Sequence, residues 1–260
     1  EGTIRYRNTR GFSPVVAWNA SHEWISFAKQ FGRTVPHGFR PEKFAEFLGV
    51  QWLLIGLPLA PLVVAGIGRG PGAMRDGDAL RGYNTDVEGV RAALTETAGA
   101  SLAGEPALVL GAGGAGRAAA LALARLGCSL TVVNRTPAAA ERLAALITAG
   151  VPGATCDWIP LSALTGRLVA GRRVVVNATS LGMAGQGKVP ALLADNVTAG
   201  QVVFDAVYAS TATDFLVAAQ ARGATVVDGV TMLLWQAAGA FTLWTGLPAP
   251  LEVMRDAVRR

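Results

Sequence analysis

The 260-residue sequence has few cysteines, histidines, aromatic residues and charges, and each shortage excludes a class of protein. Cys128 and Cys156 are the two cysteines, too few for a disulfide framework, and neither stands at a metal-ligand spacing from His22 or His37. We therefore expect no metal site, and a reducing, cytoplasmic location. Aromatic residues make up 7% of the chain, which suits helices and buried parallel strands better than an aromatic binding surface.

Long hydrophobic and long basic runs are also missing. The most apolar stretch, 52–67, contains two glycines and two prolines and is shorter than the roughly 20 residues of a membrane-spanning helix. We therefore expect no membrane partner. The net charge of +5 favours anionic ligands, but the basic residues are scattered, so we do not expect a nucleic-acid partner.

Hydrophobic residues, mostly Ala, Val and Leu, form 51% of the chain, enough for a sizeable core. From about residue 104, short β-rich runs alternate with Ala/Leu-rich helical stretches, as in βαβ units on a parallel sheet. This alternation predicts strands at 107–110, 129–134, 174–177, 202–205 and 225–227, and helices at 115–126, 138–147 and 213–221. Thr136 and Pro137 mark the start of the second of these helices as a cap and a first helical residue.

The remaining segments predict a smaller second α/β domain and helices at the end of the chain. The first hundred residues predict helices at 41–48 and 86–97 and a strand at 52–57, whereas 232–244 and 250–258 read as helices without a strand between them. The fold class we expect is α/β, with a doubly wound C-terminal parallel sheet and a smaller N-terminal α/β domain. The expected domains are 1–85 for the substrate, 86–228 for the nucleotide, and 229–260 as helices that return to the substrate domain.

A glycine-rich loop lies between the first predicted strand and helix of the sheet. Gly111, Gly113 and Gly116 follow the G-x-G-x-x-G pattern, in which the glycines permit a tight turn, approach of a pyrophosphate and close packing of helix on strand. A plain βα turn is the alternative. The cofactor-binding residues predicted here are Gly111, Ala112, Gly113, Gly114 and Ala115.

The end of the next strand indicates which dinucleotide is bound. An NAD-binding protein usually carries an acidic residue here, but this chain has Asn134, Arg135 and Thr136. The guanidinium of Arg135 matches the geometry of a 2′-phosphate, which predicts NADP(H) as the cofactor. Alternatively, Arg135 is a solvated loop charge and Thr136 only a helix cap.

Several motifs together resemble the shikimate dehydrogenase family. They are YNTD at 83–86, GAGGAGRA at 111–118, NRT at 134–136, NATSLGM at 177–183, DAVY at 205–208, DGVTML at 228–233, Gln236 and FTLWTG at 241–246. Their order and spacing cover about two thirds of the chain. The resemblance implies a two-domain enzyme of aromatic amino-acid biosynthesis that reduces 3-dehydroshikimate to shikimate with NADPH, as a monomer or homodimer.

The resemblance also assigns roles to residues. It implies that Asp86 is catalytic and that a hydroxylated cyclic carboxylate binds to Ser13, Asn84, Gln236 and Tyr208. It adds Thr179, Met183 and Met232 to the cofactor site. Asp86 as a helix cap and Gln236 as a helix-surface residue are the alternatives.

The N-terminal part departs from the family pattern. Gly11 replaces the first serine of the family's Ser-x-Ser-Pro motif, and Gly56 and Ala60 stand where its threonine and catalytic lysine are expected. Loss of a general acid–base costs about 10²–10⁴-fold in rate, so impaired activity is expected. His37 and Lys43 are candidates to replace the lysine.

Three alternative functions stay open. They are a non-catalytic NADP(H)-binding homologue, a quinate or aminoshikimate dehydrogenase, and a dehydrogenase that prefers NAD(H).

Overall fold

The computed structural model describes residues 6–7, 75–76, 79–80, 83–98, 101–209 and 211–258. The chain divides into two compact units, Glu1–Tyr83 and Asn84–Arg260. In the first unit, β1 (Tyr6–Arg7), β3 (Ala79–Leu80) and β2 (Arg75–Asp76) form a small antiparallel sheet in that order. The predicted helix at 41–48 and strand at 52–57 lie outside the described residues, as do Ser13 and the positions of the expected serine, threonine and lysine. The predicted domain division stays a prediction.

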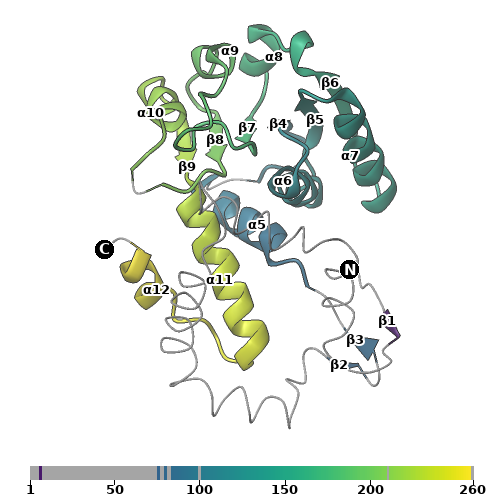
Figure 1. The fold of residues 1–260 in the computed structure, drawn as a ribbon, viewed down its shortest axis with the longest axis vertical. Coiled ribbons are helices and arrows are strands. Elements are labelled where there is room, and N and C mark those ends of the chain that lie inside the picture. Colours follow the sequence, from purple (N-terminus) through teal and green to yellow (C-terminus); the bar gives the residue numbers. More distant parts are fainter. Residues whose placement is uncertain are drawn as a thin grey trace, which may run out of the picture. The chain divides into compact units, whose positions relative to one another are not determined.

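The second unit is built on a six-stranded parallel sheet (Figure 1). Its strands are β4 (Pro106–Leu110), β5 (Ser129–Asn134), β6 (Cys156–Pro160), β7 (Val174–Asn177), β8 (Val202–Asp205) and β9 (Thr225–Val227). They lie in the order β6-β5-β4-β7-β8-β9. This is the order 3-2-1-4-5-6 of doubly wound dinucleotide-binding sheets, whose ligands bind where the winding reverses, here between β4 and β7.

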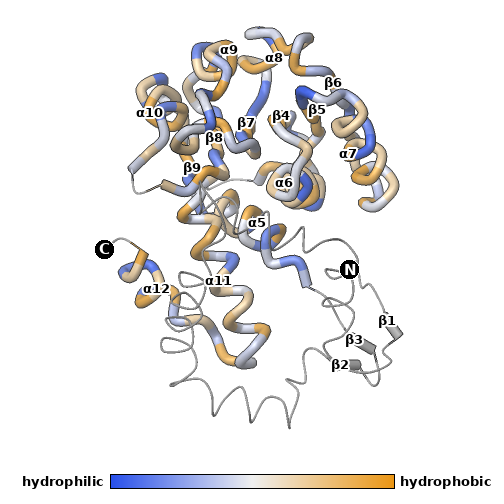
Figure 2. Tube along the Cα trace, viewed as in Figure 1, coloured by the Kyte–Doolittle hydropathy of each residue, from blue (hydrophilic) through white to orange (hydrophobic). Residues whose placement is uncertain are grey.

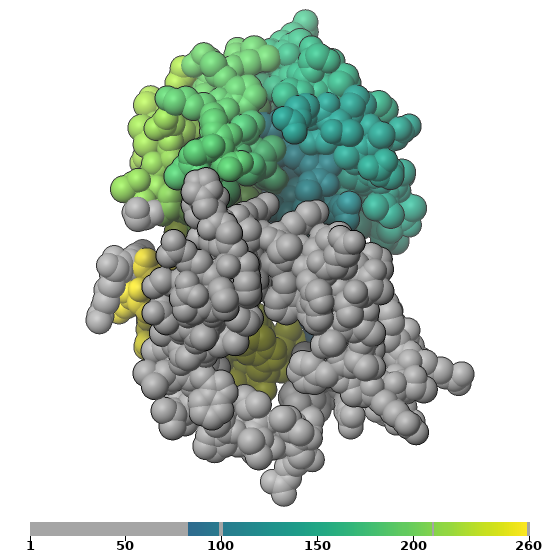
Figure 3. All heavy atoms as spheres, in the orientation of Figure 1, coloured from purple at the N-terminus to yellow at the C-terminus, as the bar shows by residue number. Residues whose placement is uncertain are grey.

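Helices cover both faces of this sheet because successive strand side chains point to opposite sides. In β4, Ala107 and Val109 belong to one buried cluster and Leu108 and Leu110 to the other. The helices are α5 (Thr85–Ala98), α6 (Gly114–Arg125), α7 (Pro137–Gly150), η2 (Leu161–Ala163), α8 (Gly166–Ala170), α9 (Ala191–Asp195), α10 (Asp214–Ala221), α11 (Gly229–Thr245) and α12 (Leu251–Val258). Residues of α5, α6 and α7 pack in the first cluster, and residues of α8, α9 and α10 pack in the second. In the space-filling view the teal and green residues form one closely packed body (Figure 3).

Most of the predicted elements of this sheet are confirmed. Four predicted strands coincide with β5, β7, β8 and β9. The remaining one, β4, is one residue longer than predicted and starts at Pro106. β6, the short helices α8 and α9, and the η2 turn were not predicted from the sequence. Among the described strands, β6 pairs only with β5. Its sequence CDWIP places Asp157 and Pro160 in a strand at the edge of the sheet, where neither an apolar run nor a strict alternation is needed.

The helix α11 is mostly orange along its length in the hydropathy colouring (Figure 2). The Oδ1 atom of Asp228 caps its start by accepting a 2.7 Å hydrogen bond from the Thr231 N–H, and Gly246, with φ of 70°, ends it. It packs against α5, and both helices contribute to the first cluster through residues such as Val90 and Met232. Within the described ranges, no helix has the length and hydropathy needed to cross a membrane.

One carboxylate joins the three helices α5, α11 and α12. Glu96 of α5 accepts a 2.8 Å hydrogen bond at Oε2 from Nε1 of Trp235 and forms a 2.9 Å ion pair at Oε1 with Nη2 of Arg255. Trp235 precedes Gln236 in α11, so the Glu96 carboxylate fixes the segment of α11 that carries this glutamine.

Candidate functional site

The glycine loop between β4 and α6 is held by close backbone contacts. Gly111 has φ of 110°, a value that L-residues rarely adopt, and a Cβ atom there would lie 2.8 Å from the carbonyl oxygen of Ala178. A Cβ atom at Gly116 would overlap the carbonyl oxygen of Gly111. The first and third glycines of the pattern therefore have the predicted turn and packing roles.

The middle of the loop is open. Gly113 and Gly114 are exposed, and a Cβ atom at either position would meet nothing within 4 Å. Gly113 is the N-cap of α6 and supplies no side-chain cap, so no side chain competes for the N–H groups of the first helical turn. Ala112 is buried and Ala115 half-buried beside them. This combination fits a pyrophosphate, which needs close backbone approach and helix N–H groups.

The turn after β5 carries Arg135, the residue predicted to bind a 2′-phosphate. The Nδ2 atom of Asn134 donates a 3.0 Å hydrogen bond to the carbonyl of Thr136, which closes the turn around an exposed Arg135. Thr136 is the N-cap of α7 by position, and Pro137 is in the first turn, as predicted. The side chain of Thr136 makes no capping hydrogen bond. The N–H of Ala139 bonds to the backbone carbonyl of Thr136 instead, so the hydroxyl stays out of the cap.

A buried polar network lies at the carboxyl ends of β7 and β8. The sheet register pairs Asn177 with Asp205, both fully buried, and Nδ2 of Asn177 donates a 2.8 Å hydrogen bond to Oδ1 of Asp205. The Asn177 amide also donates to the Leu181 carbonyl and accepts from the hydroxyl and N–H of Thr179. A single amide thus shapes the loop that follows β7.

The Asp205 carboxylate shapes the loop that follows β8, as the Asn177 amide shapes the loop that follows β7. Its Oδ1 also accepts from the Val207 N–H at 3.1 Å, and its Oδ2 accepts from Oγ1 of Thr213 at 2.7 Å. Thr213 in turn caps α10 by accepting from the Leu216 N–H. Burial raises the pKa of Asp205, and the hydrogen bonds from Thr213, Val207 and Asn177 oppose that rise.

A second carboxylate, Asp86, lies in the first turn of α5. The Nε2 atom of Gln236 in α11 donates a 2.6 Å hydrogen bond to its Oδ1. Asn84 caps α5, because its Oδ1 accepts from the N–H groups of Asp86 and Val87. The alternatives considered above, in which Asp86 is the helix cap and Gln236 an ordinary surface residue, are therefore wrong. Both side chains are half-buried and bonded to each other.

Close packing of α5 on α11 makes this pair possible. A Cβ atom at Gly89 would lie 2.9 Å from the carbonyl oxygen of Met232 and 3.2 Å from Cβ of Gln236. Gly89 therefore removes the side chain that would hold the two helices apart. The sequence analysis missed this residue, although a glycine inside a predicted helix commonly has a packing reason.

The other predicted site residues lie on the loops at this edge of the sheet and on α11. Thr179 and Met183 are half-buried on the loop after β7, Met232 is buried in α11, and Tyr208 is 62% exposed on the loop after β8. A Cβ atom at Gly111 would lie 3.0 Å from Cγ2 of Thr179, so this threonine borders the glycine loop. Among the described residues, Tyr208 has no side-chain hydrogen-bond partner in this structure.

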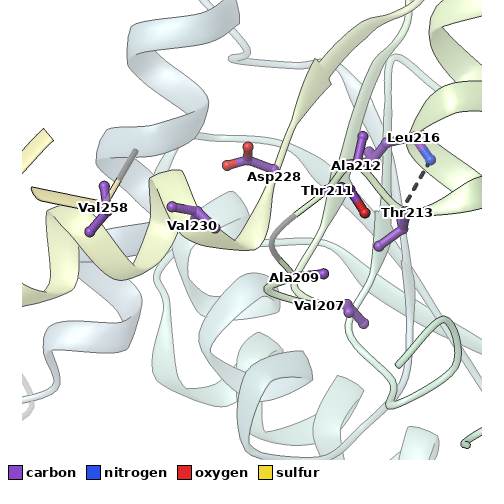
Figure 4. A pocket seen from close by; sticks show the side chains of 9 residues that line it. All are labelled: Val207, Ala209, Thr211, Ala212, Thr213, Leu216, Asp228, Val230 and Val258. Atoms are coloured by element: carbon purple, nitrogen blue, oxygen red, sulfur yellow. Dashed lines mark hydrogen bonds between the residues drawn. The ribbon is translucent and has the colours of Figure 1, made fainter. Parts of the chain in front are cut away.

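A pocket of about 280 Å³ lies beside the loop after β8 (Figure 4). Its lining comes from that loop, from the starts of α10 and α11, and from the end of α12, and it includes Val207, Thr213 and Asp228. It is separate from the glycine loop.

The strand order and the bare glycine loop define a protein of the dinucleotide-binding class with a Rossmann-type α/β fold. Two family models match the second unit. "Shikimate / quinate 5-dehydrogenase" matches residues 93–205, and "Shikimate 5'-dehydrogenase C-terminal domain" matches residues 229–259.

Individual relatives agree with these models. The chain is 47% identical to "Shikimate dehydrogenase (NADP(+))" of Halorubrum lacusprofundi over 73% of its own length and 66% of the relative. It is 37% identical to the protein of the same name from Archaeoglobus fulgidus over 100% of its own length and 97% of the relative. The crystal structure of shikimate 5-dehydrogenase from Thermus thermophilus in complex with NADP(H) and shikimate matches with a TM-score of 0.57 and 40% identity, over 69% of this chain and 63% of that chain. The chain belongs to the shikimate dehydrogenase family.

Proposed function

We propose that the protein is an NADP(H)-dependent oxidoreductase that interconverts 3-dehydroshikimate and shikimate in aromatic amino-acid biosynthesis. The observation that carries the proposal is the hydrogen-bonded pair of Asp86 and Gln236, because it joins two helices of the second unit and presents polar atoms suited to a hydroxylated substrate. The relatives named shikimate dehydrogenase (NADP(+)) support the same activity.

The cofactor is held by backbone at one end and by side chains at the other. The exposed Gly113 and Gly114 and the start of α6 fit its pyrophosphate. Arg135 supplies the positive charge for a 2′-phosphate, and Asn134 holds the turn on which it stands. When bound, NADPH supplies the hydride and NADP⁺ accepts it. Thr179, Met183 and Met232 complete the site we propose.

The Asp86–Gln236 pair binds the hydroxyl groups of the substrate. With Nε2 of Gln236 on Oδ1 of Asp86, the second carboxylate oxygen and the amide oxygen make no hydrogen bond to another described residue. Both are acceptors, and hydroxyl hydrogens are the donors that a polyhydroxylated ring offers. Asp86 thereby orients the reacting hydroxyl and accepts its proton at Oδ2. We propose further that Asn84, Tyr208 and Ser13 contribute to this site.

Proton transfer is the step for which the sequence lacks a residue. Ala60 stands where the family resemblance places a catalytic lysine, so Asp86 is left as the proton acceptor that we assign. A missing general acid–base slows catalysis about 10²–10⁴-fold. We therefore propose slow turnover, which Ala60→Lys accelerates.

Two measurements on the full chain test the proposal. NADP⁺ and shikimate should give a slow rise of reduced-nicotinamide absorbance, and calorimetry should show NADPH binding. Asp86→Asn should lower kcat about 10²–10⁴-fold while NADPH affinity is kept, because an amide cannot accept the proton. No reaction with shikimate in the unaltered protein or in Ala60→Lys, despite NADPH binding, would overturn the enzymatic proposal and favour the non-catalytic homologue. Reaction with quinate or an amino analogue in place of shikimate would reassign the substrate.

We also propose a cytoplasmic location and a monomeric or homodimeric state.

A further inference from the structure

Asp205 lies at a junction that none of the proposed cofactor or substrate contacts uses. It is fully buried, and its two oxygens accept from three directions: Asn177 on the neighbouring strand, the Val207 N–H on its own loop, and Thr213 at the start of α10. Buried carboxylates are costly unless they are hydrogen-bonded, so these partners are required by the fold wherever Asp205 is charged.

Two of these partners, Asn177 and Val207, lie next to parts of the candidate site. Asn177 continues into Ala178, whose carbonyl oxygen would be 2.8 Å from a Cβ at Gly111. On the other side, the carbonyl oxygens of Ala206 and Val207 would be 2.8 and 2.6 Å from a Cβ at Gly229, the first residue of α11. The loop after β7 thus lies directly against the glycine loop, and the loop after β8 lies directly against the start of the helix that carries Met232 and Gln236.

We infer that Asp205 is a positioning residue. Through Asn177, Val207 and Thr213 it holds the loops after β7 and β8 in fixed positions relative to each other, and it thereby sets the geometry of the NADP(H) site. The inference rests on the proposed function, because it assumes that the glycine loop binds the dinucleotide. Asp205 itself touches neither cofactor nor substrate in this assignment.

Thr213→Val tests this role of Asp205 most directly, because it removes the hydroxyl that bonds to Asp205 and nearly keeps the shape of the side chain. It also removes the cap of α10, and Thr165→Val controls for that loss. Thr165 caps α8 with a 3.3 Å hydrogen bond from the Leu168 N–H, where Thr213 has 3.4 Å from the Leu216 N–H. Thr165 is exposed whereas Thr213 is buried, and Thr165 has no bond to a carboxylate among the described residues. Thr213→Ser restores the hydroxyl.

The first readout is the ligand-free protein. The N–H groups of Thr179, Leu181 and Val207 are bonded within the network. In Thr213→Val their hydrogen exchange should accelerate by roughly five- to tenfold, the size expected for one lost hydrogen bond, and in Thr165→Val it should not change. Thr213→Ser should exchange like the unaltered protein.

The second readout is NADPH binding by calorimetry, well below the melting temperature of each variant. Thr213→Val should weaken binding by about tenfold, whereas Thr165→Val and Thr213→Ser should bind like the unaltered protein. Equal affinities in Thr213→Val and Thr165→Val would overturn the inference, even if both variants are less stable. If the unaltered protein does not bind NADPH, the proposed function fails, and the exchange measurement still decides whether Asp205 fixes the loops. If Thr213→Val does not fold, Thr213→Ala replaces it with Thr165→Ala as its control, because both again remove the hydroxyl. Unchanged exchange and affinity in Thr213→Ala would overturn the inference.

Discussion

Gln236 donates a 2.6 Å hydrogen bond from Nε2 to Oδ1 of Asp86, although 150 positions separate the two residues in the sequence. The bond requires α5 and α11 to approach closely. Gly89, three residues after Asp86, permits that approach because a side chain there would meet the backbone of α11.

Gly89→Ala should therefore separate the two helices and lengthen the bond between Asp86 and Gln236. Overpacking costs about 1–3 kcal/mol, which offsets or exceeds the gain of about 1 kcal/mol from replacing glycine by alanine in a helix. We expect a lower kcat/KM for shikimate with little change in NADPH affinity. Steady-state kinetics and calorimetry measure both.

Gly239→Ala is the matched control for this substitution. Gly239 lies in α11, and a Cβ atom there would be 3.8 Å from Cγ2 of Thr85 in α5, an ordinary contact. This variant should gain stability in thermal unfolding and keep its kcat/KM. Equal kcat/KM values in the two variants would show that the approach at Gly89 does not position the pair.

Arg135→Ala should reduce the affinity for NADPH by about 10- to 100-fold, the range expected for a lost charge-assisted hydrogen bond, and leave the affinity for NADH unchanged. Arg142→Ala serves as the control, because Arg142 is also exposed and lies further along α7. Calorimetric titration with both dinucleotides measures the ratio. An unchanged NADPH affinity would instead favour the NAD(H)-preferring alternative.

Asp205 should give the protein a pH-dependent stability that Asp205→Asn lacks. Burial raises the pKa of Asp205 above its ordinary 3.8 in the folded state. Between 3.8 and the raised value the folded protein binds this proton more tightly than the unfolded chain, so the contribution of Asp205 to stability falls as the pH rises through that window and is constant above it. Urea unfolding at several pH values should show that the free energy of unfolding of the unaltered protein, minus that of the variant, decreases from acid toward neutral pH. A difference independent of pH would contradict the raised pKa.

Both cysteine thiols should react slowly in the native protein. Burial, followed by the charge of Glu105, raises the pKa of Cys128 to about 11, and burial, followed by the charge of Asp157, raises the pKa of Cys156 to about 11. At pH 8 about one thiol in a thousand is then ionised, and the thiolate is the reactive form. An aromatic disulfide reagent should modify two thiols rapidly in urea and neither rapidly without it. A fast-reacting thiol in the native protein would contradict this expectation.

The sequence predicted the parts of the fold that depend on local pattern. The apolar β-branched runs of β5, β7 and β8 and the glycines of the loop after β4 are such patterns, because each residue reports on its own backbone or burial. β6 escaped prediction because an edge strand tolerates Asp157 and Pro160. The family resemblance pointed to Asp86 and Gln236, whereas their direct hydrogen bond emerged only from the packing of α5 on α11.

The hydrogen bonds around Asp205 likewise could not be predicted from the sequence. Asn177 and Asp205 each end an apolar strand, which is a local signal for the ligand-binding edge of a parallel sheet. Their pairing depends on the register between β7 and β8, and the contribution of Thr213 depends on where α10 begins. Register and helix placement are properties of the assembled sheet, so no single segment of the sequence encodes them.

Gly111 lies against the backbone of Ala178, and Gly116 lies against the backbone of Gly111, so that neither glycine has room for a side chain. A loop of this kind has no rotamers, and it offers the same surface to any ligand with the same diphosphate. It cannot distinguish NADP(H) from NAD(H), which share that group. We expect discrimination to depend on Asn134, which ends β5, and on Arg135 and Thr136, which follow it. We therefore expect cofactor preference to be separable from cofactor binding and open to redesign at Arg135 and Thr136, with Asn134 kept to close the turn and without alteration of the glycine loop.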